Sequence, residues 1–284
     1  MATIIHDVAE MQSAARALRS SGKRISLVPT MGALHEGHLS LIRLARQHAD
    51  AVVTTIFVNP AQFRPGEDFE RYPRNFPSDC SLAEGAGTDY LFAPEARAIY
   101  PDGYLTFVDV ERLSGVLEGR SRPGHFRGVA TVVAKLFHIA QPHVAVFGQK
   151  DAQQVLLVRR MIQDLNFDVQ LVVAPIVREP DGLAMSSRNA YLTPEERSQA
   201  PLLYEALCLG EKKIRDGERA SAAIVAAVAS LIRARSGGRV DYISLADAVT
   251  LEELPAIAPG HRILLSLAVW FGSTRLIDNL LITV

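Results

Sequence analysis

The chain has 284 residues, of which 48% are hydrophobic and 21% charged, which suits one large globular domain and a smaller one. Its formal net charge of -1 gives no electrostatic basis for binding nucleic acid, and Cys80 and Cys208 have no spacing for a zinc site or a disulfide framework, as expected in the cytoplasm. The N-terminus lacks the features of a signal peptide, and the longest weakly polar stretch, 220–232, suits a packed helix and is too short for a bilayer, so no membrane partner is expected.

Strands and helices are predicted to alternate over the first part of the chain. The apolar, β-branched runs that predict strands are 25–29, 51–58, 89–92, 143–147 and 169–173. Helical spacing of apolar residues predicts helices at 38–49, 129–139 and 152–165. Helical crossovers between buried strands are typical of parallel βαβ units. The prediction is therefore an α/β fold with a doubly wound, Rossmann-like parallel sheet.

The pattern changes at the turn-rich segment 178–182, which predicts domains at 1–178 and 179–284. Thr193, Pro194 and Glu196 form a capping sequence for a helix that is expected to reach Arg215. A second helix is predicted at 219–235, followed by strands at 240–245, 263–271 and 275–282. The smaller C-terminal domain is thus predicted to be α+β.

Two histidines, in the sequence His35-Glu36-Gly37-His38, follow the first buried strand after the loop 30–34. The start of a helix offers unpaired N–H groups and a partial positive charge, and the imidazoles add donors for phosphate oxygens. A nucleotide phosphate site is the leading interpretation. The alternatives are that both are surface residues, or that they are metal ligands three positions apart.

Other polar groups follow the carboxyl ends of later predicted strands, where open α/β sheets bind ligands. These groups lie in 59–63, in 148–154 and in the stretch from 176 to 188, and we expect the loops to converge on one cleft. No P-loop, dinucleotide fingerprint or nucleophile elbow is present.

Several residues in these loops suit phosphate or a small acid. Lys150 is suited to phosphate, with Asp151 capping a helix or holding a ribose hydroxyl, although the two could be a surface pair. Ser186, Ser187 and Arg188 suit a mobile phosphate clamp or an ordinary helix cap.

Gln62 and Gln154 are neutral amides that suit a substrate with hydroxyls and a carboxylate. The segment 122–128 is either a glycine-hinged flap or a basic turn.

Five blocks of sequence together carry a resemblance to a known family. In chain order they are PTMGALHEGH at 29–38, FVNPAQF at 57–63, RPGHF at 122–126, FGQKD at 147–151 and MSSRN at 185–189. With them the chain closely resembles the pantothenate synthetases, members of the nucleotidyltransferases with an HxGH motif, and the match runs nearly end to end. One departure is Gln149, where many relatives carry Glu.

The resemblance implies ATP-dependent condensation of (R)-pantoate with β-alanine to pantothenate, AMP and pyrophosphate through a pantoyl-adenylate. It assigns ATP binding to Met31, Gly32, Ala33, Leu34, His35, Glu36, Gly37, His38, Gly148, Gln149, Lys150, Asp151, Val177, Met185, Ser186, Ser187 and Arg188. Within that set His38, as proton donor, His35, Lys150, Ser186, Ser187 and Arg188 are expected to be catalytic. Pantoate is assigned to Gln62 and Gln154, with Gln62 also near β-alanine, and the secondary substrate candidates are Asn59, Tyr72, Arg122 and His125.

The resemblance also implies Mg²⁺ held by phosphate oxygens and water with no dedicated protein ligands, a C-terminal lid domain and a homodimer. Two other functions stay open from the sequence. One is a related HxGH nucleotidyltransferase that leaves the nucleotide on its acceptor, and the other is a nucleotide-binding relative without turnover.

Overall fold

A computed structural model describes residues 1–284, and the contacts within it divide the chain into two compact units. The N-terminal unit comprises residues 1–149 and 153–175, and the C-terminal unit comprises residues 150–152 and 176–284. The division into functional domains at 1–178 and 179–284 stays a prediction.

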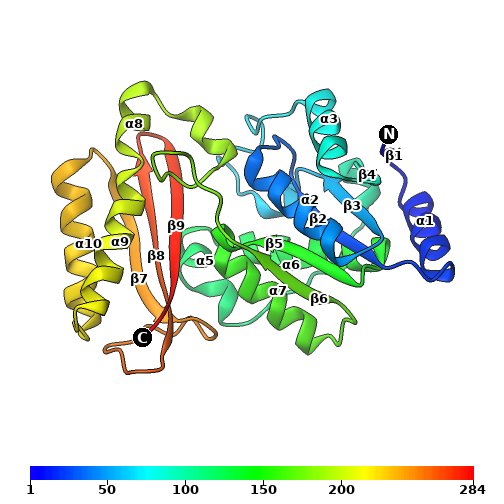
Figure 1. Ribbon diagram of the computed structural model, residues 1–284. Coiled ribbons are helices and arrows are strands. Elements are labelled where there is room, and N and C mark those ends of the chain that lie inside the picture. Colours follow the sequence, from blue (N-terminus) through cyan, green and yellow to red (C-terminus); the bar gives the residue numbers. More distant parts are fainter. The chain divides into compact units, whose positions relative to one another are not determined.

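The N-terminal unit is built on one parallel sheet of six strands in the order β1-β4-β3-β2-β5-β6 (Figure 1). Its strands are β1 Thr3–Ile5, β2 Ile25–Thr30, β3 Ala51–Ile56, β4 Tyr90–Phe92, β5 Val144–Gly148 and β6 Gln170–Ala174. The chain winds from β2 toward β3 in one direction and from β5 toward β6 in the other, so the topology switches between β2 and β5. This confirms the doubly wound fold and marks the carboxyl ends of β2 and β5 as the expected ligand edge.

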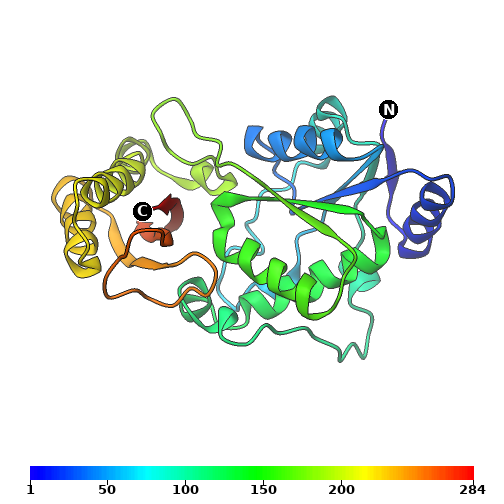
Figure 2. The ribbon, with the colours of Figure 1, turned by 60° about the horizontal axis from the view of Figure 1, so that its bottom comes forward.

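Helices cover both faces of this sheet. They are α1 Val8–Ser20, α2 Glu36–His48, α3 Phe76–Ala86, α4 Ala96–Ile99, α5 Glu118–Ser121, α6 His125–Ala140 and α7 Ala152–Asp164, with 3₁₀ turns η1 Pro60–Gln62, η2 Leu113–Gly115 and η3 Gln149–Asp151. Figure 2 shows α2 on the face of the sheet opposite α6 and α7. Ile42 and Ala45 of α2 and Ala83 of α3 share one apolar cluster with Val28 and Val146 of the strands.

Three sequence predictions for this unit need correction. Strand β1 was missed, because three residues are too short to give a strand pattern. Helix α2 begins two residues before the predicted start, at Glu36. Helix α6 begins four residues before the predicted start at 129, because Gly124 in a turn adopts a φ of 87° as its N-cap and residues 125–128 form its first turn. A flap role for the segment 122–128 stays a prediction.

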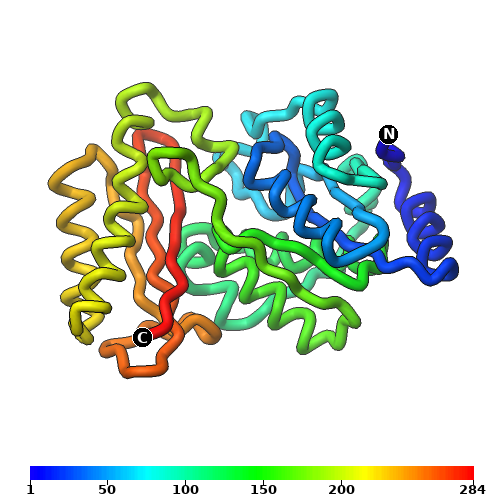
Figure 3. The backbone as a smooth tube through the Cα atoms, in the orientation of Figure 1, coloured from blue at the N-terminus to red at the C-terminus, as the bar shows by residue number.

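The C-terminal unit packs helices against an antiparallel sheet in the order β7-β8-β9. Its elements are the 3₁₀ helix η4 Ser187–Tyr191, the helices α8 Pro194–Gln199, α9 Leu202–Arg215 and α10 Ser221–Arg235, and the strands β7 Arg239–Asp247, β8 Arg262–Phe271 and β9 Thr274–Thr283. Figure 3 follows β9, in red, to the C-terminus. The α+β prediction is confirmed, and the predicted packed stretch 220–232 lies in α10 from Ser221 on, with Ala220 as the N-cap.

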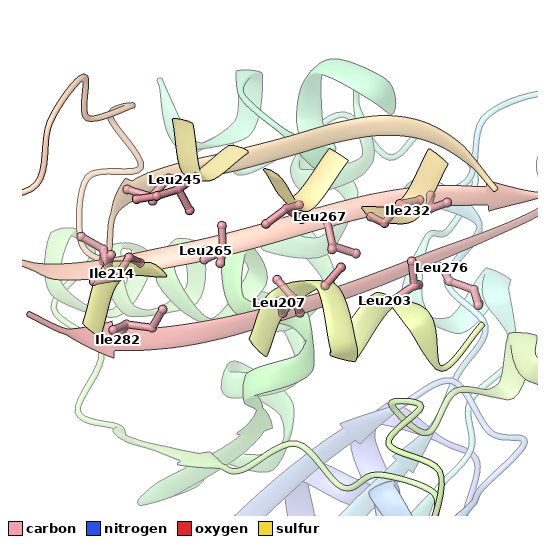
Figure 4. Close-up of a cluster of buried hydrophobic side chains, with 14 of the residues drawn as sticks. Leu203, Leu207, Ile214, Ile232, Leu245, Leu265, Leu267, Leu276 and Ile282 are labelled. Carbon is pink, nitrogen blue, oxygen red and sulfur yellow. The ribbon is translucent and has the colours of Figure 1, made fainter. Parts of the chain in front are cut away.

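One core joins these helices to the sheet. Leu207 and Ile232 from the helices meet Leu265, Leu267 and Leu276 from the strands, all nearly inaccessible to water (Figure 4). Burying such side chains stabilises the unit by about 1.5 to 3 kcal/mol each.

The single helix predicted from Thr193 to Arg215 is wrong beyond its start. The capping box is present, with the Glu196 N–H 3.3 Å from Thr193 Oγ1 and the Thr193 N–H 2.9 Å from Glu196 Oε2. The helix nevertheless divides into α8 and α9 around Ala200 and Pro201. Proline has no N–H to donate and its ring clashes with the preceding turn, so it begins a new helix instead of continuing one. None of the helices in the chain is both long and apolar enough to cross a membrane.

Candidate nucleotide and substrate site

The paired histidines lie at the start of α2, directly after the loop that leaves β2. His35 is the N-cap residue, and its Nδ1 accepts the Gly37 N–H at 3.2 Å. The Nδ1 of His38 accepts the His35 N–H at 3.3 Å, and the two ring centroids are 4.1 Å apart. Because each Nδ1 accepts a hydrogen bond, the N–H of each neutral ring lies at Nε2. The motif therefore caps its own helix and fixes the tautomer of both imidazoles.

A buried carboxylate that the sequence analysis did not single out supports the loop before these histidines. Asp79, on α3, accepts the Ala33 N–H at 2.9 Å and the Leu34 N–H at 2.8 Å. Only 3% of its surface is exposed. Its position in the first turn of a helix looks like that of an ordinary surface acid, so no local signal marks it.

Gln62 lies at the centre of a second group in the N-terminal unit. Its Oε1 accepts from Asn59 Nδ2 at 3.0 Å, and its Nε2 lies 3.1 Å from Met31 Sδ. Its backbone carbonyl accepts from His125 Nδ1 at 2.9 Å and from Arg122 Nη2 at 3.3 Å. The structure thus brings together four predicted substrate residues and one predicted ATP residue.

His125 is held in its neutral form by this arrangement. Burial and the neighbouring Arg122 guanidinium lower the pKa of His125 from 6.5 to about 4. Its Nδ1 donates to the Gln62 carbonyl, so Nε2 is unprotonated and accepts from Arg122 Nη1 at 3.2 Å. Arg122 also pairs with Glu67 at 2.6 Å, and this pairing opposes the effect of burial and lowers the pKa of the carboxyl. These groups form a connected network behind Gln62.

Asn59 is bonded to protein atoms through both donors of its amide. One hydrogen goes to Gln62 Oε1, and the other goes to the Gly128 carbonyl at 3.1 Å. Gly128 is required there, because a Cβ on it would lie 2.2 Å from the Ala61 carbonyl oxygen. Tyr72 is nearly buried and packs edge-on against Phe63, the residue that ends η1.

The C-terminal unit holds Lys150 through its backbone. The carbonyl of Lys150 accepts from Asn279 Nδ2 at 3.0 Å, and Lys150 Nζ lies 3.8 Å from Asp151 Oδ1. Asn279 and its neighbour Asp278 are both buried on β9. Two polar residues inside the apolar run LIDNLLI were a signal that the sequence analysis did not use.

The other predicted ATP residues of this unit lie on one turn. Val177 accepts the Met185 N–H at 3.0 Å, beside an antiparallel bridge between Arg178 and Ala184. Ser186 caps η4 by accepting the Arg188 N–H at 3.2 Å. The helix-cap interpretation of Ser186 is therefore correct, and a phosphate role for it stays a prediction.

Arg178 anchors this turn to the sheet. Its guanidinium bonds both oxygens of Asp278, at 2.7 and 3.0 Å, and lies 3.7 Å from the centre of the Tyr204 ring. A forked arginine–carboxylate pair is both strong and directional. The pair fixes the turn that carries Val177 and Met185.

The remaining predicted residues are placed as follows. Gly148 ends β5, the strand beside β2 in the sheet. Gln149 lies in η3, and Gln154, half-buried, lies in the first turn of α7. The next residue to Gln154, Gln153, is buried and bonds the backbone of Glu118, Leu113 and Val116. Nowhere in the chain do three His, Cys, Asp or Glu side chains gather as metal ligands would.

Comparison with known proteins finds relatives that match almost the full length of the chain. The family model for pantoate–β-alanine ligase matches residues 3–281. The pantothenate synthetase of Moorella thermoacetica is 54% identical over 281 residues, or 99% of each chain. That of Roseiflexus sp. (strain RS-1) is 55% identical over 276 residues, 97% of this chain and 98% of the relative.

Solved structures give the same result. The crystal structure of pantothenate synthetase from Thermus thermophilus matches with a TM-score of 0.91 and 46% identity, covering 98% of each chain. The pantoate–β-alanine ligase of Francisella tularensis, complexed with beta-gamma ATP and beta-alanine, matches with a TM-score of 0.79 and 35% identity over 99% of this chain and 98% of that one.

The sheet topology and the paired histidines at the start of α2 define an α/β enzyme of the nucleotide-dependent HxGH class. Within that class the chain belongs to the pantoate–β-alanine ligase family, whose model covers almost its full length.

Proposed function

We propose that this chain joins (R)-pantoate to β-alanine at the expense of ATP, giving pantothenate, AMP and pyrophosphate, a step of pantothenate and coenzyme A biosynthesis. The observation that carries the phosphate chemistry is the placement of His35 and His38 at the start of α2, immediately beyond β2 at the topological switch of the sheet. The substrates follow from family membership and from the similarity to the Francisella tularensis ligase, which was solved in complex with beta-gamma ATP and beta-alanine.

In the first step the pantoate carboxylate attacks the α-phosphorus of ATP. A carboxylate oxygen–phosphorus bond forms, the bond to the bridging oxygen breaks, and pyrophosphate leaves with its electron pair. Groups that offset the charge developing on pyrophosphate lower this barrier. We assign that work to the Nε2–H donors of His35 and His38 and to Lys150, Ser187 and Arg188. His38 would be the proton donor only in its imidazolium form, in which its Nδ1 no longer accepts the His35 N–H. Ser186 would act in part by shaping η4.

In the second step the β-alanine amine attacks the acyl carbon of the pantoyl-adenylate. The carbon–nitrogen bond forms, AMP leaves with the former carboxylate oxygen, and the amine loses a proton. Holding both reactants in one orientation is the main contribution that the protein can make here. We assign pantoate to the side chains of Gln62 and Gln154, with Gln62 near β-alanine as well.

The predicted secondary substrate residues fall into two groups, those that contact Gln62 and one that contacts Phe63. Both donors of Asn59 are bonded to protein, and His125 and Arg122 bond the backbone of Gln62. We propose that these three orient Gln62. Tyr72 would shape the same region through Phe63.

The remaining parts of the proposal rest on the chemistry of the substrates and on the family resemblance. ATP would arrive as its Mg²⁺ complex, with the metal bound by phosphate oxygens and water. Adenine is assigned to the Val177 backbone. A cytoplasmic location and a homodimer complete the proposal, and light scattering on the purified chain tests the dimer.

A product assay tests the function. The purified chain is incubated with ATP, Mg²⁺, pantoate and β-alanine, each acid is omitted in turn, and AMP is separated from ADP. We expect AMP and pantothenate only with both acids, and exchange of pyrophosphate into ATP with pantoate alone. A nucleotide left on the acceptor would indicate the related nucleotidyltransferase reaction, and ATP binding without any product would indicate a binding protein.

A further inference from the structure

The turn that leads into His35 has a backbone that needs support. Gly32 and Ala33 adopt φ angles of +84° and +51°, two consecutive residues in the left-handed region. Alanine enters that region at a cost, because its Cβ approaches the backbone. Such a turn persists only where its surroundings hold it.

The Asp79 carboxylate supplies that support from another element. Its Oδ2 and Oδ1 accept the consecutive N–H groups of Ala33 and Leu34 at 2.9 and 2.8 Å. Hydrogen bonds to an ionised acceptor are the strong ones, and water has almost no access to this carboxylate. The two bonds therefore hold the turn at its two central amides.

Gly32 leaves just enough room for this carboxylate. A Cβ on Gly32 would lie 2.9 Å from Asp79 Oδ2 and 3.1 Å from Ile56 Cγ2. Any side chain at position 32 would push the carboxylate away from the amides. The glycine and the aspartate thus form a matched pair, 47 positions apart in the sequence.

We propose that Asp79 is a positioning residue that sets the Gly32–Leu34 turn, and through it the His35 cap and the His38 ring, for the nucleotide phosphates. The proposal rests on the proposed function for its ligand. Asp79 acts through the turn, because its oxygens face the amides of Ala33 and Leu34. Misplacing reacting groups by about 1 Å can cost up to 10²-fold in rate, so a loosened turn has a measurable consequence.

The matched variants are Asp79→Asn and Asp89→Asn in the full chain. Asp89 also accepts a backbone N–H, from Val52 at 2.7 Å, and pairs with Arg46. It precedes β4, so it lies at the amino-terminal edge of the sheet, opposite the edge that carries the motif. Asp79→Asn keeps the shape of the side chain but presents an NH₂ group to one of the two backbone amides.

Two readouts are measured on each variant. Hydrogen exchange reports protection of the Ala33 and Leu34 amides, and pantoate-dependent exchange of pyrophosphate into ATP reports the first chemical step. For Asp79→Asn we expect loss of protection at both amides and a roughly 10- to 100-fold slower pyrophosphate exchange. Asp89→Asn should keep both the amide protection and the rate of pyrophosphate exchange, even if its melting temperature changes.

The proposal is overturned if Asp79→Asn keeps its amide protection, or if it exchanges pyrophosphate at the wild-type rate. Should Asp79→Asn not fold, hydrogen exchange on the wild-type chain makes the test: protection of the Ala33 and Leu34 amides is expected, and free exchange of both would overturn the proposal. Wild-type protein that exchanges no pyrophosphate would contradict the proposed function. The amide protection would still decide the role of Asp79.

Discussion

The two units hold their proposed ATP residues in different ways. In the N-terminal unit the histidine motif follows a central strand, caps its own helix and is supported by two bonds from the buried Asp79 carboxylate. In the C-terminal unit the side chain that bonds the backbone of Lys150 is neutral, the Asn279 amide, which donates to the Lys150 carbonyl. A recognisable motif and the residue that holds it are therefore separate features of the chain. Asp79 and Asn279 both lie far in the sequence from the residues that they bond.

The rate of pyrophosphate exchange should fall most on loss of His38 or Lys150, the residues assigned as donor and as charge in the first step. His38→Ala and Lys150→Ala should each slow pyrophosphate exchange by about 10² or more, the scale of a lost acid–base or electrostatic group. His48→Ala, at the other end of α2, and Lys23→Ala, on an exposed turn, are the matched controls and should exchange normally. A site variant that exchanges pyrophosphate at the wild-type rate would contradict the assignment of that residue to the first step.

How far the sequence predicts this arrangement depends on the range of the signal. The strand β2, the loop and, to within two residues, the start of α2 were predictable, because hydrophobic periodicity and helix-start chemistry are local. Pro201 was also a local signal, for the end of α8. The capping box at Thr193 nevertheless led to the prediction of a single helix that continues past this proline. Asp79 and Asn279 were not predictable as partners, because their role exists only once α3 lies under the loop and β9 lies beside Lys150.

A second comparison concerns pH, since the network behind Gln62 depends on a neutral His125. Its pKa of about 4 in the folded chain lies below the ordinary 6.5, so between these values the unfolded chain binds the extra proton. Stability should therefore be complete above about pH 6.5 and fall as the pH drops toward 4, by on the order of 3 kcal/mol.

Urea unfolding of wild type and His125→Asn across this range measures the effect. The variant has no imidazole to titrate at this position, so its curve should be flatter between pH 4 and 6.5. Two parallel curves would show that His125 does not contribute to the pH dependence.

Loss of the neutral hydrogen bond from Asn279 to the Lys150 carbonyl should reduce activity least. Asn279→Leu removes the donor to the Lys150 carbonyl, and a neutral hydrogen bond is worth about 0.5 to 1.5 kcal/mol, which corresponds to at most about a tenfold rise in the KM for ATP. The fold-loss of activity in Asn279→Leu should be smaller than the fold-loss in Asp79→Asn. The reverse order would contradict the view that the histidine loop is the more firmly held of the two. Urea unfolding of both variants separates this effect from a general loss of stability.

In the proposed reaction the pantoate carboxylate becomes bonded to the α-phosphate before the amine attacks. The most direct measurement is a single reaction with pantoate labelled with ¹⁸O in its carboxylate, followed by mass spectrometry of the AMP. We expect one ¹⁸O in the phosphate of each AMP formed, because AMP leaves with a carboxylate oxygen. Pantothenate formed with unlabelled AMP would contradict it.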